Sequence, residues 1–254
     1  LLLRTLADAE ALRALALAGS RAVVIGGGFI GVEVAASLAS RGVAVIVLEL
    51  SDGLWGGSLG PGVSDWAAGR LAAAGVDLRL GAAVSAVESA GVRVGEELLP
   101  ADFVVAGVGV TPRVELAAAA GLAVDDGIVV DGRQQASTAG IFAAGDVARP
   151  VDGPRVEHWH AAREAGERAA LAMLGEAVPP RRAPWVFSEF AGAKLDVVGW
   201  SPRWDELLAR DGLVAYVVGG RVAQLAVLDG AVEVEAARAF VERSPSPSRL
   251  AELG

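Results

Sequence analysis

Residues 21–50 read RAVVIGGGFIGVEVAASLASRGVAVIVLEL and decide the fold of the first part of the chain. The run at 21–25 is short and β-branched, which is typical of a buried parallel strand. The pattern then predicts a helix over 29–40 and a second buried strand over 43–48. A strand, a helix and a strand within about 30 residues predict a right-handed βαβ crossover, so the fold class is α/β with a Rossmann-like first domain.

The glycines between the first strand and the helix have the spacing Gly26-x-Gly28-x-x-Gly31. In a dinucleotide-binding turn, the first glycine permits a tight turn and the second lets a pyrophosphate approach the backbone. The third lets the helix pack close to the sheet. The anion would then lie at the helix N-terminus, where free N–H groups favour negative charge. The alternative is a glycine turn without a ligand, which the strand, the spacing and the helix together disfavour.

Glu49 closes the second strand and is placed to accept hydrogen bonds from a ribose diol. A carboxylate at this position repels a 2′-phosphate, and no arginine follows it through Asp52. The sequence therefore predicts that NADH binds in preference to NADPH. A second glycine cluster at 56–62 contains Pro61 and follows no strand, so residues 53–62 are predicted to form a loop.

The remaining elements are predicted from hydrophobic periodicity and turn residues. Helices are expected at 8–18, 64–74 (with Ser64 as the N-cap), 164–174 and 234–242. Strands are expected at 76–80, 128–130, 141–143, 195–198, 213–218 and 222–228, with an antiparallel meander over 83–106 that ends in a buried strand at 103–106. The proline-rich segment 178–184 is predicted to be a solvated linker between two packing units, and the tail 244–248 is predicted to fray.

Composition excludes several classes of protein. Hydrophobic residues make up 53% of the chain, which is enough for a sizeable core, and the net charge of -9 disfavours a nucleic-acid binder. The absence of cysteine excludes disulfides, thiolate metal sites and a cysteine nucleophile. With only His158 and His160, a metal site is not expected. No apolar run approaches the roughly 20 residues of a membrane span, and we expect a cytoplasmic protein.

Five stretches together resemble one family over nearly the whole chain. They are AVVIGGGFIGVEVAASLASRGVAVIVLEL (22–50), ADFVVAGVGVTP (101–112), GIFAAGDVA (140–148), VEHWHA (156–161) and PWVFSEFAGAKLDVVG (184–199). They resemble the FAD-dependent pyridine-nucleotide oxidoreductases, and the last stretch resembles the ferredoxin and rubredoxin reductase branch. The resemblance implies an NAD-binding domain at 1–106, the C-terminal part of an FAD-binding domain at 107–177, and a C-terminal α+β reductase domain at 178–254.

The resemblance also implies roles for residues that spacing alone does not assign. Glu33 would approach the nicotinamide carboxamide, Asp146 would bind the flavin ribityl chain, and Phe187 replaces an aromatic residue, often Trp, that covers flavin and nicotinamide in relatives. The further residues that we expect to bind cofactor are Phe29, Ile30, Gly107, Gly145, Glu157, His158 and Trp159. No catalytic side chain is expected, because hydride transfer between cofactors needs no side-chain acid.

The resemblance implies an enzyme that passes a hydride from NADH to FAD and then electrons to a ferredoxin or rubredoxin. A thioredoxin reductase is excluded because its CxxC motif has no counterpart here. The family's own glycine-rich FAD fingerprint does not appear before Gly26. We therefore expect either a fragment, which carries no stoichiometric FAD, or a non-catalytic NAD-binding module that has lost its flavin site.

Overall fold

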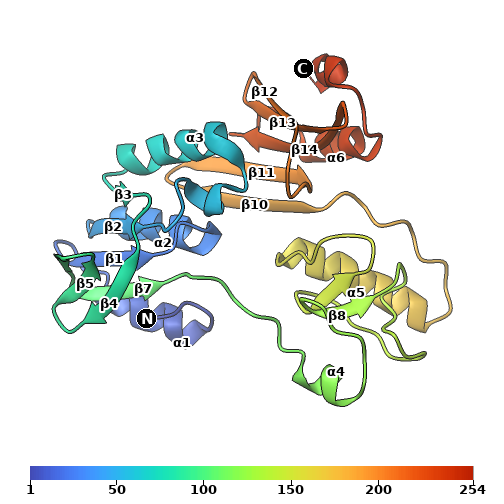
Figure 1. The fold of residues 1–254 in the computed structure, drawn as a ribbon, viewed down its shortest axis with the longest axis horizontal. Helices are drawn as coiled ribbons and strands as arrows, with labels where there is room; N and C mark the ends of the chain where they lie inside the picture. Colours follow the sequence, from blue (N-terminus) through green and yellow to red (C-terminus); the bar gives the residue numbers. More distant parts are fainter. Residues whose placement is uncertain (254) are drawn as a thin grey trace. The chain divides into compact units, whose positions relative to one another are not determined.

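The computed structural model describes residues 1–253 (Figure 1). The chain divides into two compact units. Unit 1 comprises Leu1–Gly109, Ser188–Leu195 and Ala209–Val214. Unit 2 comprises Val110–Phe187, Asp196–Leu208 and the chain from Ala215 onward. The domain bounds expected from the sequence, at 106/107 and 177/178, remain a prediction.

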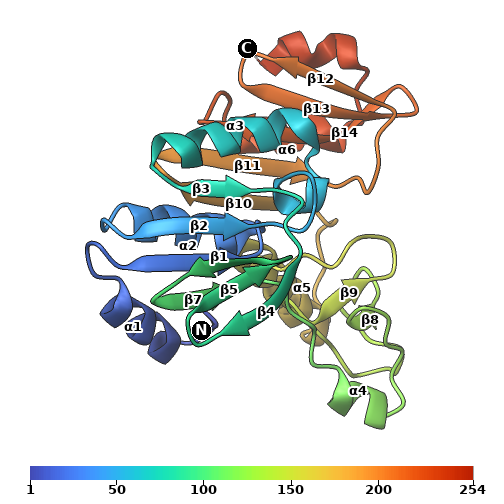
Figure 2. The ribbon, with the colours of Figure 1, turned by 60° about the vertical axis from the view of Figure 1, so that its left-hand side comes forward.

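Unit 1 is built on a parallel sheet of the strands β1 (Arg21–Ile25), β2 (Ala44–Leu48), β3 (Asp77–Arg79) and β7 (Phe103–Ala106). The strand order is β3-β2-β1-β7, and all three pairings are parallel. Helix α2 (Phe29–Ala39) connects β1 to β2. The predicted βαβ crossover is therefore confirmed, and Figure 2 shows β1, β2 and β3 side by side.

The two faces of this sheet are covered differently. Helix α2 packs on one face, where Gly31 lies close to the side chain of Val24. The other face carries the predicted meander, which forms the strands β4 (Val84–Glu88), β5 (Gly91–Val94) and β6 (Glu97–Pro100). Val92 and Leu99 of this meander pack against Val23 and Leu48 of the parallel sheet. Burying each of these side chains contributes roughly 1.5–3 kcal/mol to the stability of the fold. This packing helps to hold β1 and β2 in place.

Helix α1 (Leu6–Leu15) precedes β1 and is shorter than the predicted 8–18. Thr5 caps it: the hydroxyl of Thr5 accepts a hydrogen bond from the backbone N–H of Asp8, and the carboxylate of Asp8 accepts one from the N–H of Thr5. The helix ends at Ala16, which leaves the helical conformation. This capping box moves the helix start toward the N-terminus of the chain.

The glycine-rich segment after β2 is not the predicted loop. It forms the 3-10 turn η1 (Leu54–Gly57) and the first turn of α3 (Gly60–Ala73), with Pro61 in the first helical turn. Proline stabilises this position because its fixed φ suits the first turn and its missing N–H is not needed there. The prediction that Ser64 caps the helix is also wrong. Ser64 lies inside α3, and its hydroxyl accepts a hydrogen bond from the N–H of Leu54 at 2.9 Å.

The first part of unit 2 contains α4 (Glu115–Ala119), α5 (Trp159–Met173) and the parallel pair β8 (Ile128–Val130) and β9 (Ala148–Pro150). The strand predicted at 141–143 is wrong, since only an isolated bridge joins Phe142 to Gln135. Helix α5 begins at Trp159, before the predicted start at 164, because His158 caps it. Neither α4 nor β9 was predicted.

The C-terminal part of the chain contains a five-stranded sheet in the order β10-β11-β14-β13-β12. Its strands are β10 (Trp185–Phe190), β11 (Ala193–Gly199), β12 (Glu206–Arg210), β13 (Leu213–Val218) and β14 (Arg221–Leu228). Three of them match predicted strands, and β10 and β12 were missed. Helix α6 (Val234–Glu242) was predicted with the same bounds.

The tail does not fray as predicted. The carbonyl of Pro245 accepts a hydrogen bond from the N–H of Val222 at 2.9 Å, and the turn η2 (Pro247–Leu253) follows. Leu250 in that turn is buried. The backbone hydrogen bond and the buried leucine attach the tail to unit 2.

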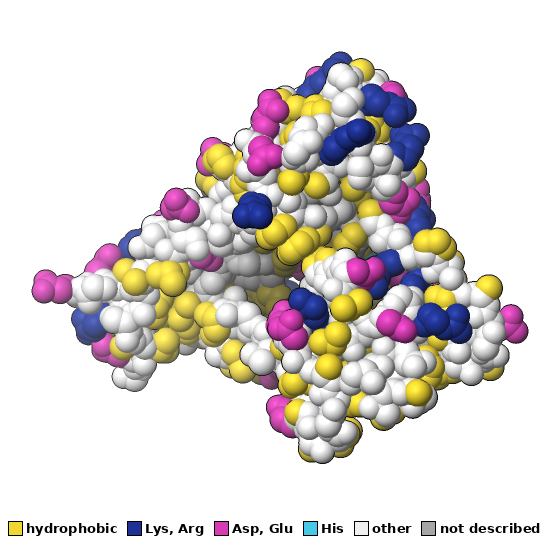
Figure 3. Space-filling view, turned by 45° about the vertical axis from the view of Figure 1, so that its right-hand side comes forward, with side chains coloured by type: hydrophobic (Ala, Val, Ile, Leu, Met, Phe, Trp, Pro, Cys, Tyr) yellow, Lys and Arg dark blue, Asp and Glu magenta, His cyan; other side chains and the backbone are white. Residues whose placement is uncertain are grey.

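Acidic and basic side chains are scattered over the face of the molecule drawn in Figure 3, without a continuous basic stripe. Among residues 1–253, no helix combines the length and apolar character of a membrane-spanning helix.

Candidate functional site

The glycine fingerprint lies at the carboxyl end of β1 and has the geometry that glycine alone permits. Gly26 has φ +104°, and a Cβ there would lie 2.4 Å from the carbonyl oxygen of Gly107. A Cβ on Gly31 would lie 1.9 Å from the carbonyl oxygen of Gly26. These distances are far inside van der Waals contact, so both glycines are needed for the turn to close.

Gly28 differs from its neighbours because it faces open space. It is the N-cap of α2, with φ -77° and ψ -174°, and no atom lies within 4 Å of a Cβ built on it. The first N–H groups of a helix have no partner within the helix, and the helix dipole is positive at this end. The space over Gly28 therefore fits an approaching diphosphate.

Glu49 has a structural role that the sequence did not reveal. Its side chain is buried, and its two carboxylate oxygens accept hydrogen bonds from the N–H of Gly27 at 2.6 Å and of Ser51 at 2.8 Å. A Cβ on Gly27 would lie 3.0 Å from Glu49 Oε2. Each carboxylate oxygen can accept a further bond, so Glu49 can hold the turn and still receive a ribose hydroxyl. The only signal in the sequence was the middle glycine of the Gly-Gly-Gly run.

Trp55 was not expected at this site. Its backbone is left-handed, at φ 55° and ψ 31°, and its N–H donates to the carbonyl of Gly27 at 2.9 Å. Its ring lies 5.7 Å from the ring of Phe29 and 6.3 Å from that of Phe190. Phe29 therefore packs against η1, while Ile30 beside it is exposed.

Gly107 and Glu33 are held by contacts within unit 1. The N–H of Gly107 donates to the carbonyl of Ile25 at 2.8 Å, which places the end of β7 beside the end of β1. The carboxylate of Glu33 on α2 accepts a hydrogen bond from the hydroxyl of Ser188 at 2.6 Å. Unit 1 thus brings together the fingerprint glycines, Glu49 and Gly107, whereas the carboxylate of Glu33 bonds Ser188 on β10.

The residues expected on the flavin side lie in unit 2. Gly145 has φ +80°, which suits glycine, and the backbone carbonyl of Asp146 accepts a hydrogen bond from Arg155. Glu157 forms a short ion pair with the same arginine, which also bonds Asp126 at 3.1 Å. The sequence does not point to Arg155, because nothing in its local pattern separates it from a surface arginine.

His158, Trp159 and Phe187 form part of an aromatic cluster. The His158 and Phe187 rings are 4.6 Å apart, and the ring of Trp159 lies 6.4 Å from that of Phe187. Trp159 remains 59% exposed, so its ring is available to a flat ligand. His160 and Trp185 extend the cluster, with their rings 4.5 Å apart.

His158 caps α5 through its imidazole ring, whose Nδ1 accepts a hydrogen bond from the N–H of His160 at 3.3 Å. Its Nε2 lies 3.4 Å from the backbone nitrogen of Phe187. A neutral imidazole has one accepting nitrogen, so only one of these contacts is a hydrogen bond at a time. Burial lowers the pKa of His158, and the charge of His160 lowers it further.

The lowered pKa predicts how stability depends on pH. The unfolded chain binds a proton at His158 below about pH 6.5, whereas the folded chain resists it, so stability falls as the pH falls below that value. Asparagine also caps helices and does not titrate, so His158→Asn should reduce the loss of folding stability between pH 7 and pH 5.5. Urea unfolding at several pH values measures the free energy of unfolding. If it depends on pH in the variant as it does in the unmodified protein, His158 is not the source of the pH dependence.

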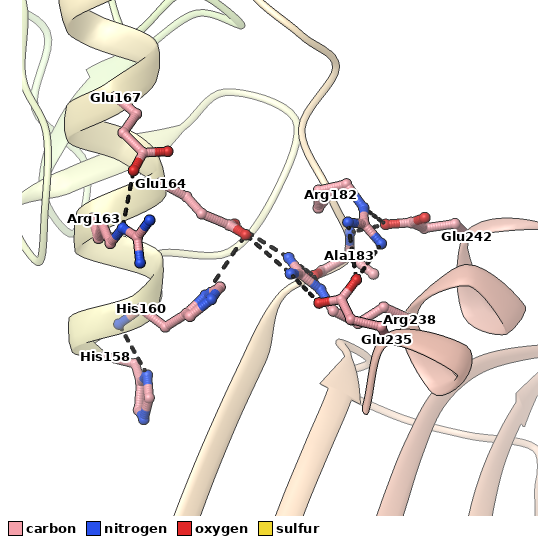
Figure 4. A network of polar contacts seen from close by, with 10 residues as sticks. All are labelled: His158, His160, Arg163, Glu164, Glu167, Arg182, Ala183, Glu235, Arg238 and Glu242. Carbon is pink, nitrogen blue, oxygen red and sulfur yellow. Dashed lines mark hydrogen bonds and ion pairs between the residues drawn. The ribbon is translucent and has the colours of Figure 1, made fainter. Parts of the chain in front are cut away.

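Pro179, Pro180 and Arg182 are exposed, as predicted for a linker at 178–184, but ion pairs and hydrogen bonds also hold this segment (Figure 4). The carboxylate of Glu242 accepts hydrogen bonds from the Arg182 side chain at 2.6 Å and from the N–H of Ala183 at 2.9 Å. The buried guanidinium of Arg238 donates to the carbonyl of Ala183 and to Glu164 on α5. Arg181 pairs with Asp152 at 2.7 Å. The segment forms no helix or strand, but side chains fix it at several points.

A parallel sheet with a glycine turn between its first strand and an open helix N-terminus defines the class of dinucleotide-binding α/β proteins. Residues 1–166 match the family described as pyridine nucleotide-disulphide oxidoreductase, and the chain belongs to this family. The resemblance inferred from the five sequence stretches is thereby confirmed.

The relatives are ferredoxin reductases. The chain is 34% identical over 273 residues to the putidaredoxin reductase of Pseudomonas putida, covering 98% of this chain and 64% of that protein. It is 36% identical over 208 residues to the ferredoxin–NAD(+) reductase component of the 3-phenylpropionate/cinnamic acid dioxygenase of Photorhabdus laumondii, covering 78% of this chain and 52% of that protein. The chain thus spans under two-thirds of the length of either relative.

A solved structure agrees with these similarities. The crystal structure of the covalent putidaredoxin reductase–putidaredoxin complex matches with a TM-score of 0.92 at 33% identity, covering 97% of this chain and 64% of that chain. The fold class inferred from the sequence is therefore confirmed.

Proposed function

We propose that this protein is an NADH-dependent flavoprotein reductase, which takes a hydride from NADH onto FAD and delivers electrons to a ferredoxin- or rubredoxin-type acceptor. The observation that carries the proposal is the open space over Gly28 at the N-terminus of α2, beside the buried carboxylate of Glu49. The named activities of the relatives support the reductase assignment and the iron–sulfur partner. A cytoplasmic location belongs to the same proposal.

The residues of unit 1 fit the dinucleotide. The backbone around Gly28 would hold the diphosphate, Glu49 would accept a ribose hydroxyl, and Glu33 would accept a hydrogen bond from the nicotinamide carboxamide. The turn is preformed, because Glu49 already fixes the N–H of Gly27. A preformed site lowers the entropy lost on binding.

Residues of unit 2 fit part of a flavin. Only the backbone carbonyl of Asp146 has a hydrogen bond among the described residues, so its carboxylate is available to a ribityl hydroxyl. The exposed ring of Trp159, with His158 and Phe187 beside it, offers an aromatic surface for the isoalloxazine edge. Glu157 forms an ion pair with Arg155, so the negative charge of Glu157 is balanced near that surface. When bound, FAD supplies the step from two-electron to one-electron chemistry.

The preference for NADH over NADPH rests on Glu49. If Glu49 accepts a ribose hydroxyl, a 2′-phosphate would bring negative charge close to its carboxylate, so we expect NADH to bind at least about tenfold more tightly than NADPH. Glu49→Gln keeps the side-chain shape and one accepting oxygen, and it should reduce the preference to threefold or less, a change of roughly 1 kcal/mol. Glu49→Ala should also weaken NADH, because it leaves the N–H groups of Gly27 and Ser51 without their acceptor. Calorimetric titration with both nucleotides measures this, and equal affinities in the unmodified protein would contradict the preference.

The complete activity is tested with the protein supplied with FAD, after an absorbance spectrum has established that the flavin binds. Rapid mixing with NADH should bleach the flavin absorbance band, and adding a [2Fe–2S] ferredoxin should restore the band as the acceptor is reduced. NADH binding without bleaching, with flavin bound, would favour the non-catalytic NAD-binding module. If the protein does not bind NADH, both the reductase and the NAD-binding module are ruled out.

A further inference from the structure

Ser188 is buried on β10 and makes one contact that links distant parts of the sequence. Its side chain is 0% exposed, and its hydroxyl donates to Oε1 of Glu33 at 2.6 Å, across 155 residues of sequence. Both residues belong to unit 1. A hydroxyl beside a carboxylate can only donate, so the direction of this bond is fixed and one oxygen of Glu33 is engaged.

Glu33 has a second environment within reach. Its side chain also lines a pocket of about 300 Å³ between α1 and α2, together with Arg13 and Arg41. Glu33 forms no ion pair with either arginine among the described residues, and it bonds Ser188 instead. Without the hydroxyl, the carboxylate would be drawn toward these two positive charges, away from the position that it now occupies.

We propose that Ser188 is a positioning residue: its hydroxyl holds the Glu33 carboxylate in the orientation that recognises the carboxamide of a nicotinamide. This inference rests on the proposed function, in which NADH binds to unit 1. The bond to Oε1 leaves Oε2 free to accept from the carboxamide NH2 group, which is a hydrogen-bond donor. An anchored carboxylate also loses less rotamer freedom when the ligand binds.

The test compares ligands that share the adenine half and differ at the nicotinamide. Calorimetry measures the affinities of NADH, of the reduced acetylpyridine analogue, which has a methyl group in place of the amide NH2, and of ADP-ribose, which has no nicotinamide. The unmodified protein should bind NADH more tightly than either. Ser188→Ala should weaken NADH binding by about three- to tenfold, the range for one ordinary hydrogen bond, because the lost bond acts on NADH only through Glu33, and it should leave ADP-ribose binding unchanged.

Matched variants separate positioning from a structural effect. Cysteine has a volume similar to that of serine and a weaker hydrogen-bond donor. The NADH affinity of Ser188→Cys should therefore lie between those of the unmodified protein and Ser188→Ala. Glu33→Gln should remove most of the preference for NADH over the acetylpyridine analogue, and adding Ser188→Ala to it should have no further effect. Adding Arg13→Met to Ser188→Ala should recover part of the NADH affinity, because it removes one competing charge. ADP-ribose binding confirms that each variant is folded.

Several results would overturn the inference. Equal weakening of NADH and ADP-ribose by Ser188→Ala would show a structural role, and no weakening of NADH would show no role. If the unmodified protein binds NADH no better than ADP-ribose, Glu33 does not recognise the carboxamide, although dinucleotide binding stands. If the unmodified protein binds neither ligand, the proposed function itself is wrong.

Discussion

Alanine at Gly31 is expected to destabilise the protein severely, whereas alanine at Gly28 is expected to leave it folded and unable to bind NADH tightly. A Cβ on Gly31 would lie 1.9 Å from the backbone carbonyl of Gly26, and the backbone cannot yield without opening the β1–α2 turn. Overpacking of side chains costs about 1–3 kcal/mol, so a clash with the backbone should cost at least about 3 kcal/mol. Urea unfolding measures this loss.

Gly28→Ala is the matched control for Gly31→Ala. Its Cβ would meet no atom within 4 Å, and its φ of -77° suits any residue. Losing glycine at an N-cap should cost about 1 kcal/mol or less. The methyl group would occupy the space over the helix N-terminus, so NADH affinity should fall by at least about tenfold. Tight NADH binding by Gly28→Ala would mean that the diphosphate does not lie there.

Loss of Arg238 is expected to have the second largest effect. Its side chain is 2% exposed and donates to both carboxylate oxygens of Glu164 and to the carbonyl of Ala183 (Figure 4). Breaking a buried ion pair by removing one partner costs about 3–5 kcal/mol. Because Glu164 is 32% exposed and water can reach it, we expect Arg238→Ala to cost about 3 kcal/mol.

Arg163→Ala is the control for this prediction, since it also removes an arginine paired with a glutamate of α5. Arg163 is 66% exposed and Glu167 is 60% exposed, so their pair should contribute only about 0.5 kcal/mol. Thermal and urea unfolding of Arg238→Ala and Arg163→Ala measure the loss of stability in each variant. Similar losses in the two would show that burial of Arg238 does not govern its contribution.

Local patterns predicted the elements whose burial follows from their own residues. The β-branched run at 21–25 and the helix from Phe29 agree with the sequence because the strand is buried on both faces and glycine caps the helix. The bounds of β13 and α6 also agree with the prediction. The prediction failed at 53–62, where Pro61 lies in the first turn of a helix instead of in a loop, and at 141–143, where a bridge replaces the strand.

The sequence by itself determined the dinucleotide turn, because glycine spacing and strand–helix periodicity are local properties that need no distant partner. Only the tertiary structure decided how the polar side chains are held. The bonds of Glu33 to Ser188 and of Arg238 to Glu164 join residues far apart in sequence. Such pairings depend on how the strands and helices pack. The sequence around a glutamate does not show whether its carboxylate is solvated, bonded to a hydroxyl or paired with a buried arginine.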